Sequence, residues 1–149
     1  MFIQEVELFE RIPSHMINEI AEFAIEESYP GEHVLFREGD LAEDLYILED
    51  GQVNLALQGE DRIVFPVTQE GSVFGWSAFV EPQRYTATAK FVMDSKVIKI
   101  DGERVLGLLE RHPHEGLIIM RRLAGVIATR LVQSYQRLRI AGPRPEAHS

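Results

Sequence analysis

The sequence predicts an α+β domain, an antiparallel β-roll or jelly roll with N-terminal helices and a long C-terminal helix. Three observations predict it: helically spaced apolar residues near the start, short apolar runs between turn residues, and a long helical pattern near the end. With 149 residues, 45% of them hydrophobic, the chain can form one domain with a buried core. We expect this domain over residues 1–141 and a loose tail over 142–149.

The first predicted helix follows Ser14, a candidate N-cap, and continues until Pro30 and Gly31 end it. Short apolar runs then predict β-strands as far as residue 100. Asp50 and Gly51 between two such runs are typical of a two-residue hairpin. The predicted strands cover residues 34–37, 45–48, 53–57, 63–65, 85–92 and 96–100.

Helices are predicted again after Asp101, first a short one and then a long one over about 113–139. Two apolar stripes follow the long helix, which favours one contact with its own domain and another with a second copy of the chain. A single wide core face is the alternative. The dimer stripe comprises Leu117, Met120, Ala124, Ile127, Leu131, Ser134 and Leu138, and the second stripe comprises Ile119, Leu123 and Val126.

The net charge of −9 is unevenly distributed along the chain. Residues 111–149 hold seven basic and two acidic side chains, whereas residues 1–110 hold eight basic and 22 acidic ones. An acidic chain argues against a domain that is basic throughout and built for nucleic acid. The arginines of the long helix are expected either on a solvated face or docked against an acidic body.

Several classes of function lack the residues they need. There is no cysteine, so disulfides and thiolate metal sites are excluded, and the scattered histidines do not suggest a metal site. We find no phosphate-binding Walker loop, nucleophile elbow or dinucleotide fingerprint, so an enzyme is not expected. No secretory signal or apolar run of membrane length is visible, and we expect a cytoplasmic protein without a membrane partner.

A series of short motifs adds to this order of elements. In chain order they are Leu8-Phe9, Ile12-Pro13, Gly31-Glu32, Leu35-Phe36-Arg37-Glu38-Gly39-Asp40, Leu45-Tyr46-Ile47-Leu48, Gly51-Gln52-Val53, Gly71, Phe74-Gly75 and Ile100-Asp101. Together they resemble the cyclic nucleotide-binding domain superfamily, the sensor half of the catabolite-activator and fumarate-nitrate-reduction regulators. The resemblance covers about residues 5–140 and implies a non-enzymatic, ligand-sensing regulatory module.

The resemblance also implies a phosphate-binding cassette, which in the family begins Phe-Gly-Glu and ends Pro-Arg-x-Ala-Thr. The family's Glu accepts the ribose 2′-hydroxyl, and its Arg pairs with the cyclic phosphate. Here Trp76 stands at the Glu position and Tyr85 at the Arg position, while Arg84 comes one residue early. A lost charge-assisted pair weakens binding by decades, so we expect ordinary cyclic AMP binding to be weakened or lost.

Three interpretations remain open: a sensor of another small anionic ligand, a cyclic AMP or cyclic GMP receptor that uses Arg84, and a ligand-free interaction module whose pocket Trp76 fills. No other cofactor is expected. The candidate pocket comprises Phe74, Gly75, Trp76, Ser77, Ala78, Arg84, Tyr85, Thr86, Thr88 and Ser134. Relatives append a DNA-binding helix-turn-helix after the long helix, and none follows here, so we expect no DNA-binding domain and a separate effector protein.

Overall fold

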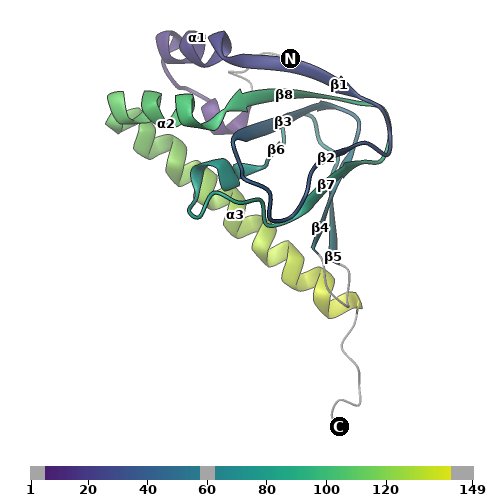
Figure 1. Ribbon diagram of the computed structural model, residues 1–149. Coiled ribbons are helices and arrows are strands. Elements are labelled where there is room, and N and C mark those ends of the chain that lie inside the picture. The colour runs from purple at the N-terminus through teal and green to yellow at the C-terminus, as the bar shows by residue number, and fades with distance from the viewer. Residues whose placement is uncertain (1–5, 58–62, 142–149) are drawn as a thin grey trace.

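A computed structural model describes residues 6–57 and 63–141 of the chain, the side chains of 137–141 excepted (Figure 1). Its helices are α1 (Ser14–Glu22), α2 (Gly102–Arg111) and α3 (Pro113–Ala141), with the short 3₁₀ helices η2 (Glu7–Phe9) and η3 (Trp76–Phe79). Its strands are β1 (Ala24–Tyr29), β2 (Val34–Phe36), β3 (Asp44–Asp50), β4 (Val53–Leu57), β5 (Ile63–Val67), β6 (Val73–Phe74), β7 (Thr88–Phe91) and β8 (Ser95–Asp101).

The strands form two antiparallel sheets of four, in the orders β1-β8-β3-β6 and β2-β7-β4-β5. At the centre of the first sheet β3 pairs with β8, with Ile47 opposite Ile98. Apolar side chains of both sheets and of α1, α2 and α3 share one buried core, which includes Phe9, Phe74 and Phe91. The predicted α+β fold with an antiparallel roll and a long C-terminal helix is therefore confirmed.

The α3 helix runs diagonally along one side of the strands, while α1 and α2 lie at one end (Figure 1). Its buried side chains include Ile119 and Leu123 of the second predicted stripe. The close approach of α2 and α3 depends on Gly116, where an added Cβ would lie only 2.7 Å from the Leu109 carbonyl oxygen. The long predicted helix is confirmed, and its N-terminal half is fixed against the domain.

The predicted dimer stripe divides between two environments. Leu117, Ala124 and Leu131 are exposed, whereas Met120 and Ile127 pack against the core of the same chain. Ser134 is half-buried, and the side chain of Leu138 lies outside the described residues. Val132 and Tyr135, which the stripe did not include, join the exposed apolar side chains of the helix. Only part of the stripe is thus available to a second copy.

The first helix is shorter than predicted, because α1 ends at Glu22 and residues 24–29 form the strand β1. This strand pairs with β8 along its whole length, from Ala24 opposite Ile100 to Tyr29 opposite Ser95. Tyr29 also stacks on Phe91, with the ring centroids 5.3 Å apart. Non-local pairing and packing therefore override the helical spacing of the local sequence.

The turn at Asp50 and Gly51 is not a hairpin, since β3 and β4 belong to different sheets. Gly51 has a φ of 102°, and an added Cβ would lie 2.1 Å from the Ser95 hydroxyl oxygen. The turn therefore passes the chain from one sheet to the other at a position where only glycine fits. The predicted strand over residues 85–92 is also shorter, because β7 covers only Thr88–Phe91.

Candidate functional site

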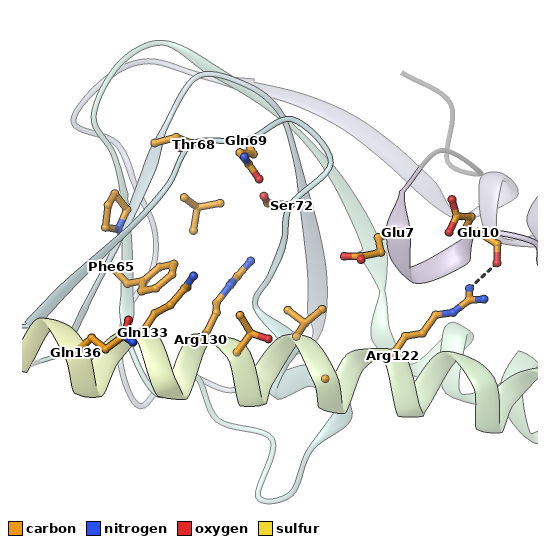
Figure 2. A pocket seen from close by; sticks show the side chains of 15 residues that line it. Glu7, Glu10, Phe65, Thr68, Gln69, Ser72, Arg122, Arg130, Gln133 and Gln136 are labelled. Carbon is orange, nitrogen blue, oxygen red and sulfur yellow. Dashed lines mark hydrogen bonds between the residues drawn. The ribbon is translucent and has the colours of Figure 1, made fainter.

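A cavity of about 1000 Å³ lies between β5, the loop that follows it, η2 and α3 (Figure 2). Its volume is at the upper end of the range of small-molecule sites, about 300–1,000 Å³. Polar side chains dominate its walls. It is lined by Glu7, Glu10, Phe65, Pro66, Val67, Thr68, Gln69, Ser72, Arg122, Gly125, Val126, Thr129, Arg130, Gln133 and Gln136.

Arg130 is the most strongly perturbed charge in this cavity. Its guanidinium carbon lies 4.7 Å from the centroid of the Trp76 ring and 5.5 Å from that of Phe65, within the range of cation–π attraction. Burial lowers its pKa to about 10. The Nη1 atom is buried and has no hydrogen-bond partner within the described residues. A buried cation without an acceptor is costly, and an anion next to it would reduce that cost.

Arg122 lies on the same helix, and its guanidinium already has hydrogen-bond partners. Its guanidinium donates to the backbone carbonyls of Leu8, at 3.3 Å, and Glu10, which ties η2 to α3. Glu7 points into the cavity from η2, and Arg130 points into it from α3 (Figure 2). One cation of the cavity therefore has a structural role, while Nη1 of the other has no acceptor within the described residues.

Trp76 lies beneath Arg130 but is absent from the cavity wall. It begins η3, which follows Gly75 in the left-handed conformation with a φ of 77°. A side chain at Gly75 would meet Tyr46, with its Cβ 3.1 Å from a ring carbon. The glycine thus lets the cassette segment turn close to β3, and the turn sets Trp76 against α3.

Tyr85 and Arg84, the two residues that compete for the family's Arg position, both point elsewhere. Tyr85 is buried and stacks on Phe36 with the ring centroids 3.7 Å apart, and its hydroxyl donates to the Asp44 carbonyl at 2.7 Å. Burial raises its pKa to about 12. Arg84 is exposed and donates to the Gly39 carbonyl at 3.1 Å. Neither side chain lines the cavity.

The other candidate pocket residues also lie outside the cavity wall, and they differ in burial. Phe74, Ser77 and Ala78 are buried, Thr86 is exposed, Ser134 is half-buried, and the hydroxyl of Thr88 accepts from the Glu38 N–H at 3.0 Å. None of the ten predicted residues is among those that line the cavity. The sequence did not single out the residues that line this cavity, and Arg130 was expected only as one of the arginines of the long helix. The eight-residue spacing of Arg122 and Arg130, about two helical turns, was the available signal.

The family model described as cyclic nucleotide-binding domain matches residues 26–112, more than half of the chain. The chain belongs to the cyclic nucleotide-binding domain family. The cyclic AMP receptor protein of Thermus thermophilus is 29% identical over 106 residues, which cover 69% of this chain and 47% of that protein. The chain therefore spans about half the length of this curated relative.

Solved structures agree with this cyclic nucleotide-binding fold. A crystal structure from Geobacter metallireducens GS-15 has a TM-score of 0.77 and 26% identity, and covers 87% of this chain and 95% of that chain. A cyclic nucleotide-binding domain from Methylobacillus flagellatus KT has a TM-score of 0.78 and 17% identity, and the match covers 96% of this chain and 82% of that chain. The predicted family is confirmed.

Two absences concern the described part of this cyclic nucleotide-binding domain. Its helices include none with the combined length and hydropathy of a membrane span. Its histidine, aspartate and glutamate side chains form no group of three or more that could hold a metal ion.

Proposed function

We propose that this domain is a non-enzymatic regulatory module that senses a small anionic ligand in the cavity between β5 and α3. The observation that carries the proposal is the guanidinium of Arg130, whose buried Nη1 lacks an acceptor among the described residues. An anionic ligand would supply that acceptor through a charge-assisted hydrogen bond. The neighbouring Thr129 and Gln133 offer further polar contacts on the same helix.

We further propose that ordinary cyclic AMP binding is weakened in this chain. The curated relative is a cyclic AMP receptor protein, and the family's cassette Glu and Arg positions hold Trp76 and Tyr85 here. The Tyr85 hydroxyl is already bonded to the Asp44 backbone, and the Arg84 guanidinium to the Gly39 carbonyl. Recruiting Arg84 would require its guanidinium to leave that carbonyl.

The ligand-free alternative is favoured by one observation. Trp76 is half-buried beneath Arg130, so ring and guanidinium together occupy space beside the cassette. A buried tryptophan is more often a packing residue than a ligand platform. The cavity of about 1000 Å³ on the β5 side supports the sensor instead, because Trp76 is not among the residues that line it.

The output is proposed to pass through α3 to a second copy of the chain and to a separate effector protein. Arg130 lines the cavity on this helix, and Leu131, Val132 and Tyr135 are exposed on it. Each of these three side chains exposes more than half of its surface. Exposed apolar residues gathered on one helix are typical of an interaction surface. A ligand that shifts Arg130 would therefore shift the proposed dimer contact.

Calorimetric titration tests the proposed function. The unmodified chain, Arg130→Met and Arg84→Met are each titrated with cyclic AMP, cyclic GMP, a cyclic di-nucleotide and hexylphosphonate. We expect an anionic probe to bind the unmodified chain and the Arg84→Met variant but not the Arg130→Met variant. Micromolar cyclic AMP binding that requires Arg84 would instead support the interpretation of the domain as a cyclic AMP receptor that uses Arg84. Absence of binding by every probe would favour the ligand-free module.

A further inference from the structure

Two opposite charges face the same cavity without meeting. Glu7 on η2 and Arg130 on α3 both point into it (Figure 2). No ion pair within 4.0 Å joins either of them to another side chain in the described residues. Glu7 is exposed to solvent, whereas the Nη1 atom of Arg130 is buried. The cavity therefore has a cationic part at Arg130 and a part near η2 where the two carboxylates of Glu7 and Glu10 outnumber the one guanidinium of Arg122.

The two parts lie at different levels along α3. Arg122 binds the carbonyls of Leu8 and Glu10, which places η2 at the level of Arg122 on the helix. Arg130 lies eight residues further along, which corresponds to about 12 Å at 1.5 Å per residue. The Glu7 side chain extends from η2 into the cavity, so a ligand that reaches both charges has to bridge part of this length rather than a single contact distance. A compact monoanion would satisfy only the guanidinium.

The groups between the two charges are neutral and polar. Ser72 and Gln69 reach the cavity from the loop after β5 (Figure 2). Thr129 of α3 also lines it. Neutral donors and acceptors can accompany a ligand backbone without favouring either sign of charge. A second phosphate close to Glu7 would be repelled. The charge pattern thus disfavours a ligand with an anion at each end.

We infer that the cavity selects an extended zwitterionic ligand, with its anionic group on Arg130 and an ammonium or similar cationic group on Glu7. The inference rests on the proposed function, because it names the class of ligand for the same cavity. Its physical basis is charge complementarity at both ends of one molecule, which gives selectivity even where the exposed end adds little affinity. Such a ligand would also connect η2 to α3, as Arg122 already does.

Matched phosphonates test the inference. Aminoethyl-, aminobutyl- and aminohexylphosphonate are titrated against ethyl-, butyl- and hexylphosphonate, which have the same anion and chain but lack the ammonium. Binding is followed by calorimetry and by the fluorescence of Trp76, the only tryptophan of the chain. We expect the ammonium to tighten binding by about threefold to fivefold for the longest pair, the range of an exposed ion pair, and by less for the shortest.

Two variants separate the ligand contact from general electrostatics. Glu7→Gln removes the proposed partner of the ammonium, whereas Glu103→Gln removes an exposed carboxylate on α2 outside the cavity. The preference for the aminophosphonate should disappear in Glu7→Gln and persist in Glu103→Gln. Equal binding of both series, with dependence on Arg130, overturns the inference and leaves the proposed function standing. A preference that persists in Glu7→Gln also overturns it, and failure of both series to bind overturns the two proposals together.

Discussion

The guanidinium carbon of Arg130 lies 4.7 Å from the centre of the Trp76 ring, so a charge of the long helix rests on the first residue of η3. This contact joins η3, where the sequence differs from the family's cassette, to α3, the helix that we propose transmits the signal. Burial lowers the pKa of Arg130 to about 10, which means that the folded protein holds this cation at a cost in free energy. An arrangement that costs stability without a ligand is typical of a binding site.

The first prediction concerns this cost. Arg130→Met should leave the free energy of unfolding unchanged or raise it by up to about 1–2 kcal/mol, because removing a buried cation without an acceptor at Nη1 outweighs the lost cation–π contacts with Trp76 and Phe65. Chemical denaturation measures the change. Arg122→Met is the matched control on the same helix, and it should lose about 1.5–3 kcal/mol because two backbone carbonyls lose a charged donor. A large loss in Arg130→Met would assign Arg130 a structural role.

The contact of Arg130 with Trp76 gives a second prediction. Trp76→Leu should lower the free energy of unfolding by about 1–2 kcal/mol, since it removes ring area and the cation–π attraction together. Trp76→Phe retains an aromatic face and should lose less. Thermal and urea unfolding followed by circular dichroism measure both variants. Equal losses in the two variants would show that the ring face contributes nothing through Arg130.

Tyr85 provides a prediction about pH. Its hydroxyl donates to the Asp44 carbonyl, and burial raises its pKa to about 12 from the usual 10. The folded state thus favours the protonated phenol, so this contribution to stability is complete below pH 10 and is lost as the pH rises towards 12. Tyr85→Phe should lower the free energy of unfolding by about 1 kcal/mol at pH 7.

Burial also raises the pKa of Tyr29 and Tyr46. Comparing the unmodified chain with Tyr85→Phe therefore separates the contribution of Tyr85 from that of the other tyrosines. The stability difference between the unmodified chain and Tyr85→Phe should shrink as the pH rises from about 9 to about 12, a range that includes the ordinary pKa of 10 and the raised pKa of about 12. A difference that stays constant over this range would contradict the assignment of the buried hydroxyl.

The sequence predicted the long helix correctly because its determinants are local: Pro113 at the start and apolar residues at helical spacing. It did not predict β1, whose partner β8 lies about 70 residues away in the chain. Nor did it predict the cavity, which is assembled from η2, β5, a loop and α3. Apart from its eight-residue spacing from Arg122, the local sequence around Arg130 does not indicate its burial. Only packing against Trp76 and Phe65 distinguishes it from the exposed Arg121.

Two glycines of α3 give a matched prediction on packing. Gly116 faces the Leu109 carbonyl, where an added Cβ would lie at 2.7 Å, whereas Gly125 has nothing within 4 Å. Gly116→Ala should therefore destabilise the protein by about 1–3 kcal/mol through overpacking. Gly125→Ala should stabilise it by about 0.5–1 kcal/mol through helix propensity. Urea denaturation of both variants measures the two signs, and equal signs would contradict the close approach of α2 and α3.

The proposed dimer gives a fifth prediction. Leu131 is 51% exposed on α3, and Leu131→Glu should place a charge in the contact between two copies. Sedimentation at micromolar concentration should show a dimer for the unmodified chain and a monomer for the variant. Thr86→Glu is the control, because Thr86 is exposed and lies far from α3 in the sequence. This variant should stay dimeric. A monomeric unmodified chain would remove the dimer from the proposed output.

The central claim is that Arg130, and not Arg84, binds an anionic ligand in this cyclic nucleotide-binding domain. Calorimetric titration of the unmodified chain, Arg130→Met and Arg84→Met with hexylphosphonate and with cyclic AMP tests it most directly. We predict that hexylphosphonate binds the unmodified chain and Arg84→Met, that Arg130→Met loses at least about tenfold in affinity, as one charge-assisted contact implies, and that cyclic AMP binds more weakly than micromolar. Micromolar cyclic AMP binding that survives Arg130→Met and is lost in Arg84→Met would contradict the claim.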